Sequence, residues 1–207
     1  MSVQDEIIPF KIIVVGDSGA GKTSIITRYT KEIFDPNNSA TIVPVYAAKV
    51  LTINGNKYQF NIWDIPGQDR NPIMTRTFAQ DTDGIIYCCE VNNENSRESL
   101  KSWEESLNSF IDTKDIPKII VENKCDKLGD ESLYNYDINT LRETGKNLRC
   151  FKFFRTSALN GYNVNEAFKT LINEMIKEIK IKGIDEYKHK KTIKLKHKNQ
   201  NTNPKCC

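Results

Sequence analysis

The stretch that decides the fold is Gly16-Asp17-Ser18-Gly19-Ala20-Gly21-Lys22-Thr23. It satisfies the pattern GxxxxGK[ST], and it joins an apolar run predicted to be a buried strand (12–15) to a predicted helix (22–30). In that context the pattern is typical of a loop that wraps phosphates, because glycines let backbone N–H groups face the anion and the helix N-terminus adds a favourable dipole. We call residues 16–23 the phosphate loop.

Within the phosphate loop, two side chains have a predicted role. The Lys22 ammonium is expected to reach the β- and γ-phosphates of a nucleotide, and the Thr23 hydroxyl is expected to ligate Mg²⁺. The alternative is a glycine-rich turn with a surface lysine, and the predicted strand and helix on either side argue against it. Nucleotide kinases of similar length carry the same pattern, so other motifs must decide the reaction.

Strands and helices alternate along the rest of the chain. Further strands are predicted at 45–53, 58–63, 85–90, 118–121 and 151–154, and further helices at 96–110, 137–147 and 164–182. Ser96 is the expected N-cap of its helix, and Asn54-Gly55 predicts a tight hairpin between the first two of these strands. The alternation predicts an α/β fold with a six-stranded, mostly parallel sheet, one antiparallel edge strand and helices on both faces.

The length of 207 residues suits one such domain. Apolar periodicity fades after Gly183, so we expect a folded domain over residues 1–182 and a disordered tail over 183–207. Residues 180–207 hold nine lysines and two acidic residues, although the formal charge of the whole chain is only +3. A basic tail on a mildly acidic domain fits contact with an anionic surface or, equally, plain solvation.

The cysteines and the N-terminal segment bear on the cellular compartment. Cys88 and Cys89 are adjacent in a predicted strand, and no cysteine has metal-ligand spacing with a histidine, which favours a reducing cytosolic environment. Residues 1–9 contain no basic residue, so we expect no secretory signal. No glycine follows Met1, so we expect no N-myristoyl group.

A second motif, Asn123-Lys124-Cys125-Asp126, follows the predicted strand 118–121 and has the form NKxD. The Asp126 carboxylate can accept hydrogen bonds from guanine N1–H and the 2-amino group, which adenine lacks, so this motif predicts guanine selectivity. Asn123 is expected to tie this loop to the phosphate loop, and the Lys124 stem to cover one face of the base. A nucleotide kinase has no role for this motif.

A third motif, of the form DxxG, lies at the end of the predicted strand 58–63. Asp64 is expected to hold Mg²⁺ through water, the Gly67 N–H to contact the γ-phosphate, and Gln68 to orient the attacking water. Thr41 follows Lys22 by 19 residues and is expected to add a second hydroxyl to Mg²⁺ and its N–H to the γ-phosphate. Phe34 is expected against the base, although a lone aromatic residue is equally consistent with the core.

With these motifs in order, the chain from about residue 10 to residue 182 resembles the small GTPases of the Ras superfamily. It resembles the Rab family in residues 16–19, 62–64 and 156–158 and in Cys206-Cys207. Residues 40–42, 74–76 and 123–126 are similar to the Rab subgroup of lysosome-related organelles. The resemblance implies a P-loop NTPase G domain with GTP as substrate, GDP as product and Mg²⁺ as cofactor.

The resemblance also implies a set of site residues. Thr156-Ser157-Ala158-Leu159 is similar to the third base-contacting loop, with the Ala158 N–H at guanine O6 and Leu159 where the family usually has lysine. The implied catalytic residues are Gln68, Lys22 and Thr41, the metal ligands are Thr23, Thr41 and Asp64, and the lipidated residues are Cys206 and Cys207. The implied nucleotide-binding residues are Ser18, Gly19, Ala20, Gly21, Lys22, Thr23, Ser24, Phe34, Thr41, Gly67, Asn123, Lys124, Asp126, Ser157, Ala158 and Leu159.

The expected function is that of a GTP/GDP switch in vesicle and membrane traffic with slow hydrolysis; the alternative is a guanine-nucleotide-binding scaffold that barely cycles. By resemblance the partners are effectors, an exchange factor, a GTPase-activating protein, an escort protein and a GDP-dissociation inhibitor, with no nucleic acid and a monomeric chain. The chain is expected on the cytoplasmic face of an intracellular membrane, lipid-anchored and cycling with the cytosol. Two departures from Rab sequences, at residues 42–46 and at Ile65-Pro66, motivate the scaffold alternative.

Overall fold

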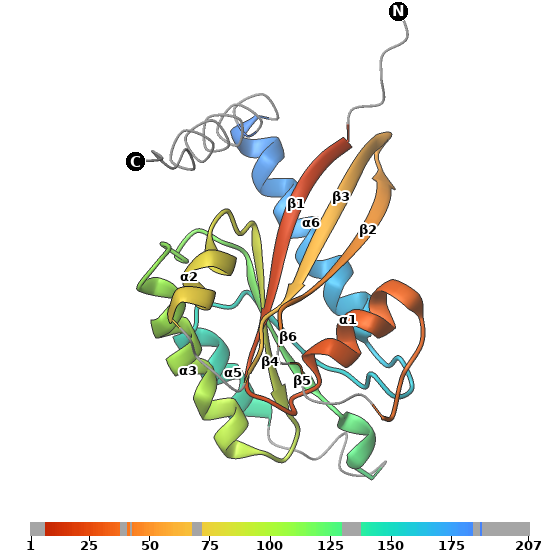
Figure 1. The fold of residues 1–207 in the computed structure, drawn as a ribbon, viewed down its shortest axis with the longest axis vertical. Coiled ribbons are helices and arrows are strands. Elements are labelled where there is room, and N and C mark those ends of the chain that lie inside the picture. The colour runs from red at the N-terminus through yellow and green to blue at the C-terminus, as the bar shows by residue number, and fades with distance from the viewer. Residues whose placement is uncertain are drawn as a thin grey trace, which may run out of the picture.

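Six strands form a single sheet in the order β2-β3-β1-β4-β5-β6 (Figure 1). The strands are β1 Ile7–Val15, β2 Val45–Ile53, β3 Asn56–Asp64, β4 Gly84–Glu90, β5 Lys118–Asn123 and β6 Lys152–Arg155. β2 pairs antiparallel with β3 through the predicted hairpin, and every other pair of neighbours is parallel. The predicted fold class is confirmed.

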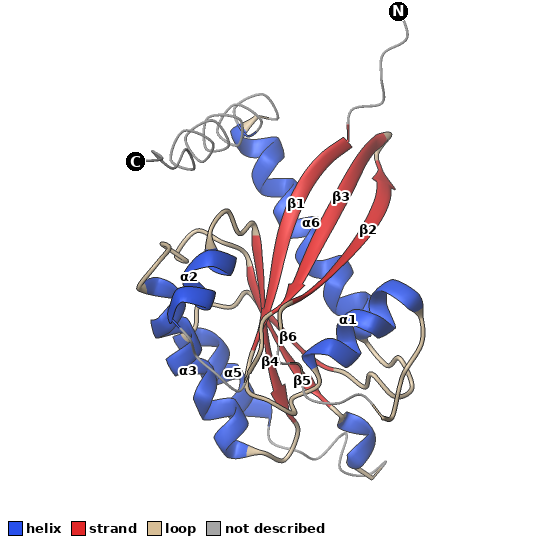
Figure 2. Ribbon diagram, viewed as in Figure 1, coloured by secondary structure: helices blue, strands red, loops and turns tan. Residues whose placement is uncertain are grey.

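Helices cover both faces of this sheet (Figure 2). They are α1 Lys22–Lys31, α2 Pro72–Ala79, α3 Glu94–Asn108, α5 Ile138–Asn147 and α6 Val164–Lys182, with a 3₁₀ turn, η1, at Cys125–Lys127. α1 and α6 pack on one face, where the rings of Tyr29 and Phe168 stack with centroids 4.0 Å apart. α2, α3 and α5 pack on the other face around the fully buried Trp103.

The computed structural model describes residues 7–37, 41, 43–67, 72–129, 138–183 and 187. No helix within these ranges is both long enough and apolar enough to cross a bilayer. The expectations for Gln68, for the cysteines Cys206 and Cys207 and, apart from Tyr187, for the tail that follows Gly183 lie outside the described residues.

β1 begins at Ile7, five residues earlier than the sequence predicted. β1 pairs with β3 from Ile7 onward, but its pairing with β4 begins only at Ile12. The edge of β1 next to Pro9 therefore carries no strand ladder, and a missing N–H costs little there. The Tyr187 hydroxyl donates to the Pro9 carbonyl on this edge at 3.1 Å.

Three further expectations were wrong in detail. The N-cap of α3 is Asn93, whose side chain accepts from the Ser96 N–H at 3.0 Å, and Ser96 itself lies inside the helix. β5 runs to Asn123, so the NKxD motif begins on the strand and not after it. The sequence did not predict α2, whose eight residues are too few for clear helical periodicity.

The topology places the functional motifs at one edge of the sheet. The parallel strands β3, β1, β4, β5 and β6 all end at that edge, and β1 lies between β3 and β4, where the order of connections reverses. Ligands of open α/β sheets bind in the crevice at such a point. The phosphate loop, which follows β1, and the motifs after β3, β5 and β6 therefore meet there.

A buried ion cluster joins α3, β5 and β6 below this edge. The Glu122 carboxylate is fully buried, with the Arg155 Nε at 3.0 Å and the Arg97 Nη1 at 3.6 Å. Both arginine side chains are at most 10% exposed. A carboxylate at this depth is tolerated because two guanidinium groups compensate its charge.

We predict that Glu122→Ala lowers the free energy of unfolding by about 3–5 kcal/mol, since it leaves two buried guanidinium groups without this carboxylate. The matched control is Glu174→Ala, which breaks a surface pair with Lys177 on α6 and is expected to cost no more than about 1 kcal/mol. Urea unfolding at a fixed nucleotide concentration measures both variants. A loss at Glu122 as small as the loss at Glu174 would contradict the prediction.

Candidate nucleotide-binding site

The phosphate loop turns sharply where it enters α1. Gly21 is the N-cap residue of α1 and has φ of 89°, a left-handed conformation that favours glycine. A Cβ atom at this position would lie 2.3 Å from the Asn123 Nδ2 atom, so a side chain is excluded by contact as well as by backbone conformation. The glycine thus allows the loop after β1 to touch the end of β5.

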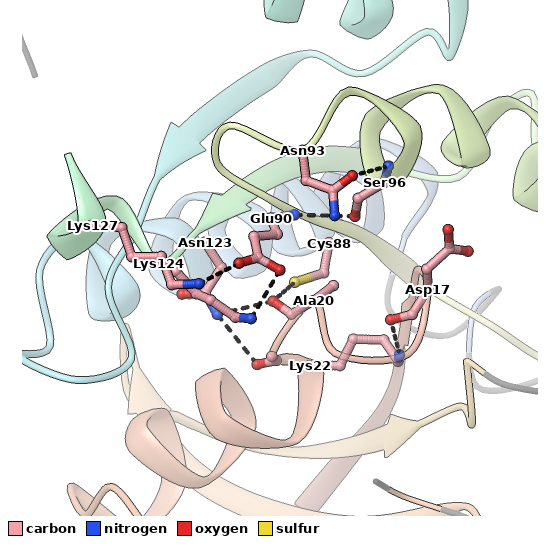
Figure 3. Close-up of polar contacts among 11 residues, drawn as sticks. Asp17, Ala20, Lys22, Cys88, Glu90, Asn93, Ser96, Asn123, Lys124 and Lys127 are labelled. Carbon is pink, nitrogen blue, oxygen red and sulfur yellow. Dashed lines mark hydrogen bonds and ion pairs between the residues drawn. The ribbon is translucent and has the colours of Figure 1, made fainter. Parts of the chain in front are cut away.

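Lys22 points back into the curve of the phosphate loop. Its Nζ atom donates to the carbonyl oxygen of Gly16 at 2.8 Å. It also donates to the carbonyl oxygen of Asp17 at 2.9 Å (Figure 3). Burial lowers the pKa of Lys22, and the nearby Asp64 carboxylate opposes this shift. The ammonium group lies where the pattern predicts a phosphate contact, with only 5% of the residue exposed.

The three expected metal ligands lie together. The Thr23 hydroxyl donates to the Asp64 Oδ2 atom, and it lies 2.6 Å from the Thr41 hydroxyl, which is 3.4 Å from the same carboxylate oxygen. Burial raises the pKa of Asp64, while the Thr23 hydrogen bond, Lys22 and Thr41 oppose the shift.

This set of donors fits Mg²⁺. All three groups are oxygen donors, and Mg²⁺ prefers oxygen ligands and keeps several waters, so it binds through few protein groups. The Asp64 Oδ1 atom is buried and has no hydrogen-bond partner among the described residues, which leaves one carboxylate oxygen for a cation or its water. In the described part of the chain no cluster of three histidine, cysteine or acidic residues offers a different kind of metal site.

Gly67, the last residue of the DxxG motif, packs against the phosphate loop. A Cβ atom there would lie 2.3 Å from the Ser18 nitrogen and 2.7 Å from the Gly16 oxygen. Just before it, the Ile65 N–H donates to the Val14 carbonyl at 3.2 Å, and Pro66 is buried. The segment after β3 is therefore held against the phosphate loop before it leaves the sheet.

Asn123 joins the base motif to the phosphate loop, as the sequence predicted. Its Nδ2 atom donates to the Ala20 carbonyl at 3.1 Å (Figure 3). Its Oδ1 atom accepts from the Thr156 hydroxyl and the Ala158 N–H, both at 3.2 Å. The Ala158 N–H, which was expected at guanine O6, thus already has an acceptor in this structure. One buried amide connects the ends of β1, β5 and β6.

The rest of the base motif is arranged by polar contacts. The Asp126 carboxylate accepts from the Ser157 hydroxyl, so the loop after β6 orients the predicted guanine acceptor. Lys124 and Lys127 pair with the Glu90 carboxylate at 2.9 Å and 2.6 Å. Partial burial raises the pKa of Glu90, but the hydrogen bonds from Lys127 and Lys124 outweigh this effect and lower the pKa overall.

These loops enclose a cavity of about 420 Å³, a size typical of small-molecule sites. Of the residues predicted to bind nucleotide, those that line it are Ser18, Gly19, Gly21, Lys22, Thr23, Ser24, Phe34, Thr41, Gly67, Asn123, Lys124, Asp126, Ala158 and Leu159. Phe34 lines the cavity and also packs on the core, and its contact with the base stays a prediction.

Two predicted residues, Ala20 and Ser157, do not line the cavity and are buried behind its wall. Three lining residues were missed from the sequence: Asp35, Pro36 and Lys127. Each lies within two residues of a predicted contact, and this closeness in the sequence was the only feature that could have indicated it. The fold and the cavity define a P-loop nucleotide-binding domain with the motifs of a guanine site.

Comparison with known proteins supports this class. The sequence pattern of the Ras family matches residues 11–177. Rab-32C of Dictyostelium discoideum is 36% identical over 168 residues, which cover 81% of this chain and 74% of that protein. RABA5c of Arabidopsis thaliana is 31% identical over 205 residues (96% and 94%), and Rab-18 of Lymnaea stagnalis is 32% identical over 176 residues (85% and 85%).

The chain therefore belongs to the Ras family of small GTPases. Because the relatives are Rab proteins, it is a Rab-type member of that family. This result confirms the family resemblance and disfavours the kinase reading. The assignment to the subgroup of lysosome-related organelles stays a prediction.

We predict that Asp126→Asn sharply weakens GTP binding and allows xanthosine triphosphate to bind, because the amide inverts the donor and acceptor pattern that faces the base. Competition against a fluorescent guanine nucleotide measures both affinities. The matched control is Asp35→Asn, which makes the same change at another carboxylate that lines the cavity. Equal binding of ATP and GTP by the wild-type chain would show that the guanine assignment is wrong.

Proposed function

We propose that this chain is a Rab-like GTPase that binds GTP and GDP in the described cavity, hydrolyses GTP slowly and switches effector binding in membrane traffic. The observation that carries the proposal is the junction at Asn123, which brings a phosphate-binding loop and a guanine-type motif to one cavity. The Rab-named relatives support the cellular role.

The residues divide the work of the reaction by position. The backbone N–H groups of the phosphate loop and the Lys22 ammonium neutralise the β- and γ-phosphates, and Asp126 selects guanine. Thr23, Thr41 and Asp64 are the residues that would hold Mg²⁺, which when bound spreads the negative charge of the phosphates. Gln68 is the residue proposed to orient the attacking water.

Two segments couple the γ-phosphate to the surface of the protein. Thr41 precedes β2, and Gly67 follows β3, so both lie near the ends of these two neighbouring strands. Contacts from these residues to the γ-phosphate hold the two segments in one arrangement, and hydrolysis releases them. The switch thus begins with contacts at the γ-phosphate, and the change in arrangement extends to the exposed face of β2 and β3.

This face carries a row of aromatic side chains, of which Tyr46 is exposed and Trp63 and Phe78 are partly buried against the core. The ring centroids of Tyr46 and Trp63 are 5.1 Å apart, and those of Trp63 and Phe78 are 5.2 Å apart, so the row spans β2, β3 and α2. Tyr46 is 49% exposed and Val43 is 67% exposed. An apolar row of this kind suits a protein partner. Val43 and Tyr46 also belong to the departure from Rab sequences, so the effector is expected to differ from that of other Rabs.

We predict single-turnover GTP hydrolysis on the order of 10⁻⁴ s⁻¹ or slower, as in unassisted Ras-type enzymes, and a further decrease for Gln68→Leu.

Pro66 fixes its own φ and restricts Ile65. It precedes Gly67, so it stiffens the point at which the second switch segment swings, and Pro66→Ala is expected to increase the rate. Equal rates for wild type and Pro66→Ala would leave Pro66 as a neutral turn residue. No measurable hydrolysis in either would favour the scaffold alternative.

The proposal also includes attachment to a membrane. We assign lipid attachment to Cys206 and Cys207, where two prenyl chains would give the stable anchoring that a single chain does not. The lysines of residues 188–198 add attraction to anionic lipid of about 1 kcal/mol for each residue near the surface.

Replacing both cysteines by serine is expected to move the protein from the membrane pellet to the soluble fraction of cells. The matched control is Cys150→Ser, which removes a thiol from the folded domain. Persistent pelleting of the double variant would contradict the assignment.

A further inference from the structure

Arg28, in the last turn of α1, makes three hydrogen bonds to backbone carbonyl oxygens. These oxygens belong to two segments that lie far apart in the sequence. Its Nε atom donates to the Ala158 oxygen at 2.8 Å, and its Nη2 atom donates to the Leu159 oxygen at 2.7 Å. Its Nη1 atom donates to the Glu32 oxygen at 2.7 Å. No motif in the sequence singled out this residue.

The first two bonds hold the middle of the loop after β6. The other carbonyls of that loop are bonded elsewhere, because the Thr156 oxygen accepts from Cys125 and the Ser157 oxygen accepts from Gly161. Among the described residues, Arg28 is the donor to the Ala158 and Leu159 oxygens. Ala158 is 3% exposed, so its carbonyl would lose its partner with little access to water.

The third bond reaches the segment that follows α1. Glu32 lies directly after α1 with φ of 62°, and its N–H donates to the Arg28 carbonyl at 3.0 Å while its own carbonyl accepts from the Arg28 side chain. The next residues lead to Phe34 and Asp35, which line the same cavity as Ala158 and Leu159. Arg28 is therefore bonded to the loop after β6 and to the residue two positions before Phe34, so it connects two segments that supply lining residues.

We propose that Arg28 is a positioning residue for guanine recognition. It fixes the distance between the wall that carries Ala158 and Leu159 and the wall that carries Phe34. The planar guanidinium group suits this task because its donors lie in a rigid fork, and a lysine ammonium at the same place cannot reach three carbonyls at once. This inference rests on the proposed function, since it assumes that the base binds between these walls.

The effect on selectivity follows from the neighbouring contacts. The Ser157 hydroxyl, in the loop that Arg28 holds, donates to the Asp126 carboxylate. When the loop shifts, Asp126 loses its orientation and with it the contact to the guanine 2-amino group. The loss of Arg28 therefore weakens the binding of GDP more than that of IDP, whose base has no 2-amino group.

The experiment measures the dissociation rates of GDP and IDP from full-length protein for the wild type, Arg28→Ala, Arg28→Lys and Lys31→Ala. Lys31 is the matched control, because it is a basic residue in the same turn of α1 and is exposed. We expect Arg28→Ala to release GDP about tenfold faster or more, equivalent to about 1.4 kcal/mol, and to bring the IDP/GDP ratio of rates toward one. Arg28→Lys should lie between, and Lys31→Ala should match the wild type.

Two results would overturn the inference while leaving the proposed function intact. One is an unchanged GDP dissociation rate in Arg28→Ala. The other is an equal increase for GDP and IDP with a lowered melting temperature, which marks a purely structural role. If Arg28→Ala does not fold, Arg28→Lys decides by the same ratio of rates. A wild-type chain that does not distinguish GDP from IDP or ADP would instead refute the proposed function.

Discussion

The site depends on the hydrogen bonds of one side chain, that of Asn123. Its amide nitrogen reaches the phosphate loop, and its amide oxygen receives donors from Thr156 and Ala158 in the loop after β6. Because Asn123 is 1% exposed, each of these bonds forms where water competes little, and an unpaired amide would be costly. Loops that follow three different strands are thereby held in a single arrangement.

This junction explains several local features of the sequence. Gly21 has no room for a side chain because the Asn123 amide lies against it, and Gly67 has none because it rests on Asp17 and Ser18. The Cys88 thiol, on β4, reaches the Ala20 carbonyl at 3.5 Å, next to the Asn123 bond (Figure 3). Small residues are thus required where the loops approach one another, and the polar residues between them satisfy the backbone groups that the approach buries.

Much of this arrangement could be predicted from the sequence, because each short motif has a known chemistry that requires a particular local structure. The alternation of strands and helices predicted the parallel sheet, and the NKxD motif predicted the link through Asn123. Other contacts between distant segments have no motif in the sequence that would predict them. The cluster of Glu122 with Arg97 and Arg155 and the bonds of Arg28 form only because the fold brings α1, α3 and β6 together. The early start of β1 was missed because the pairing of Ile7 with β3 is visible only in the sheet.

The most direct test of this account is the rate at which GDP leaves Asn123→Ala compared with the wild type. Removal of the amide breaks the bonds to the phosphate loop and to the loop after β6 together, so dissociation should be on the order of 100-fold faster, or about 2.7 kcal/mol. The sheet, which is held by the apolar core, should remain folded by circular dichroism. A folded variant that releases GDP within threefold of the wild-type rate would contradict the claim that Asn123 holds the site together.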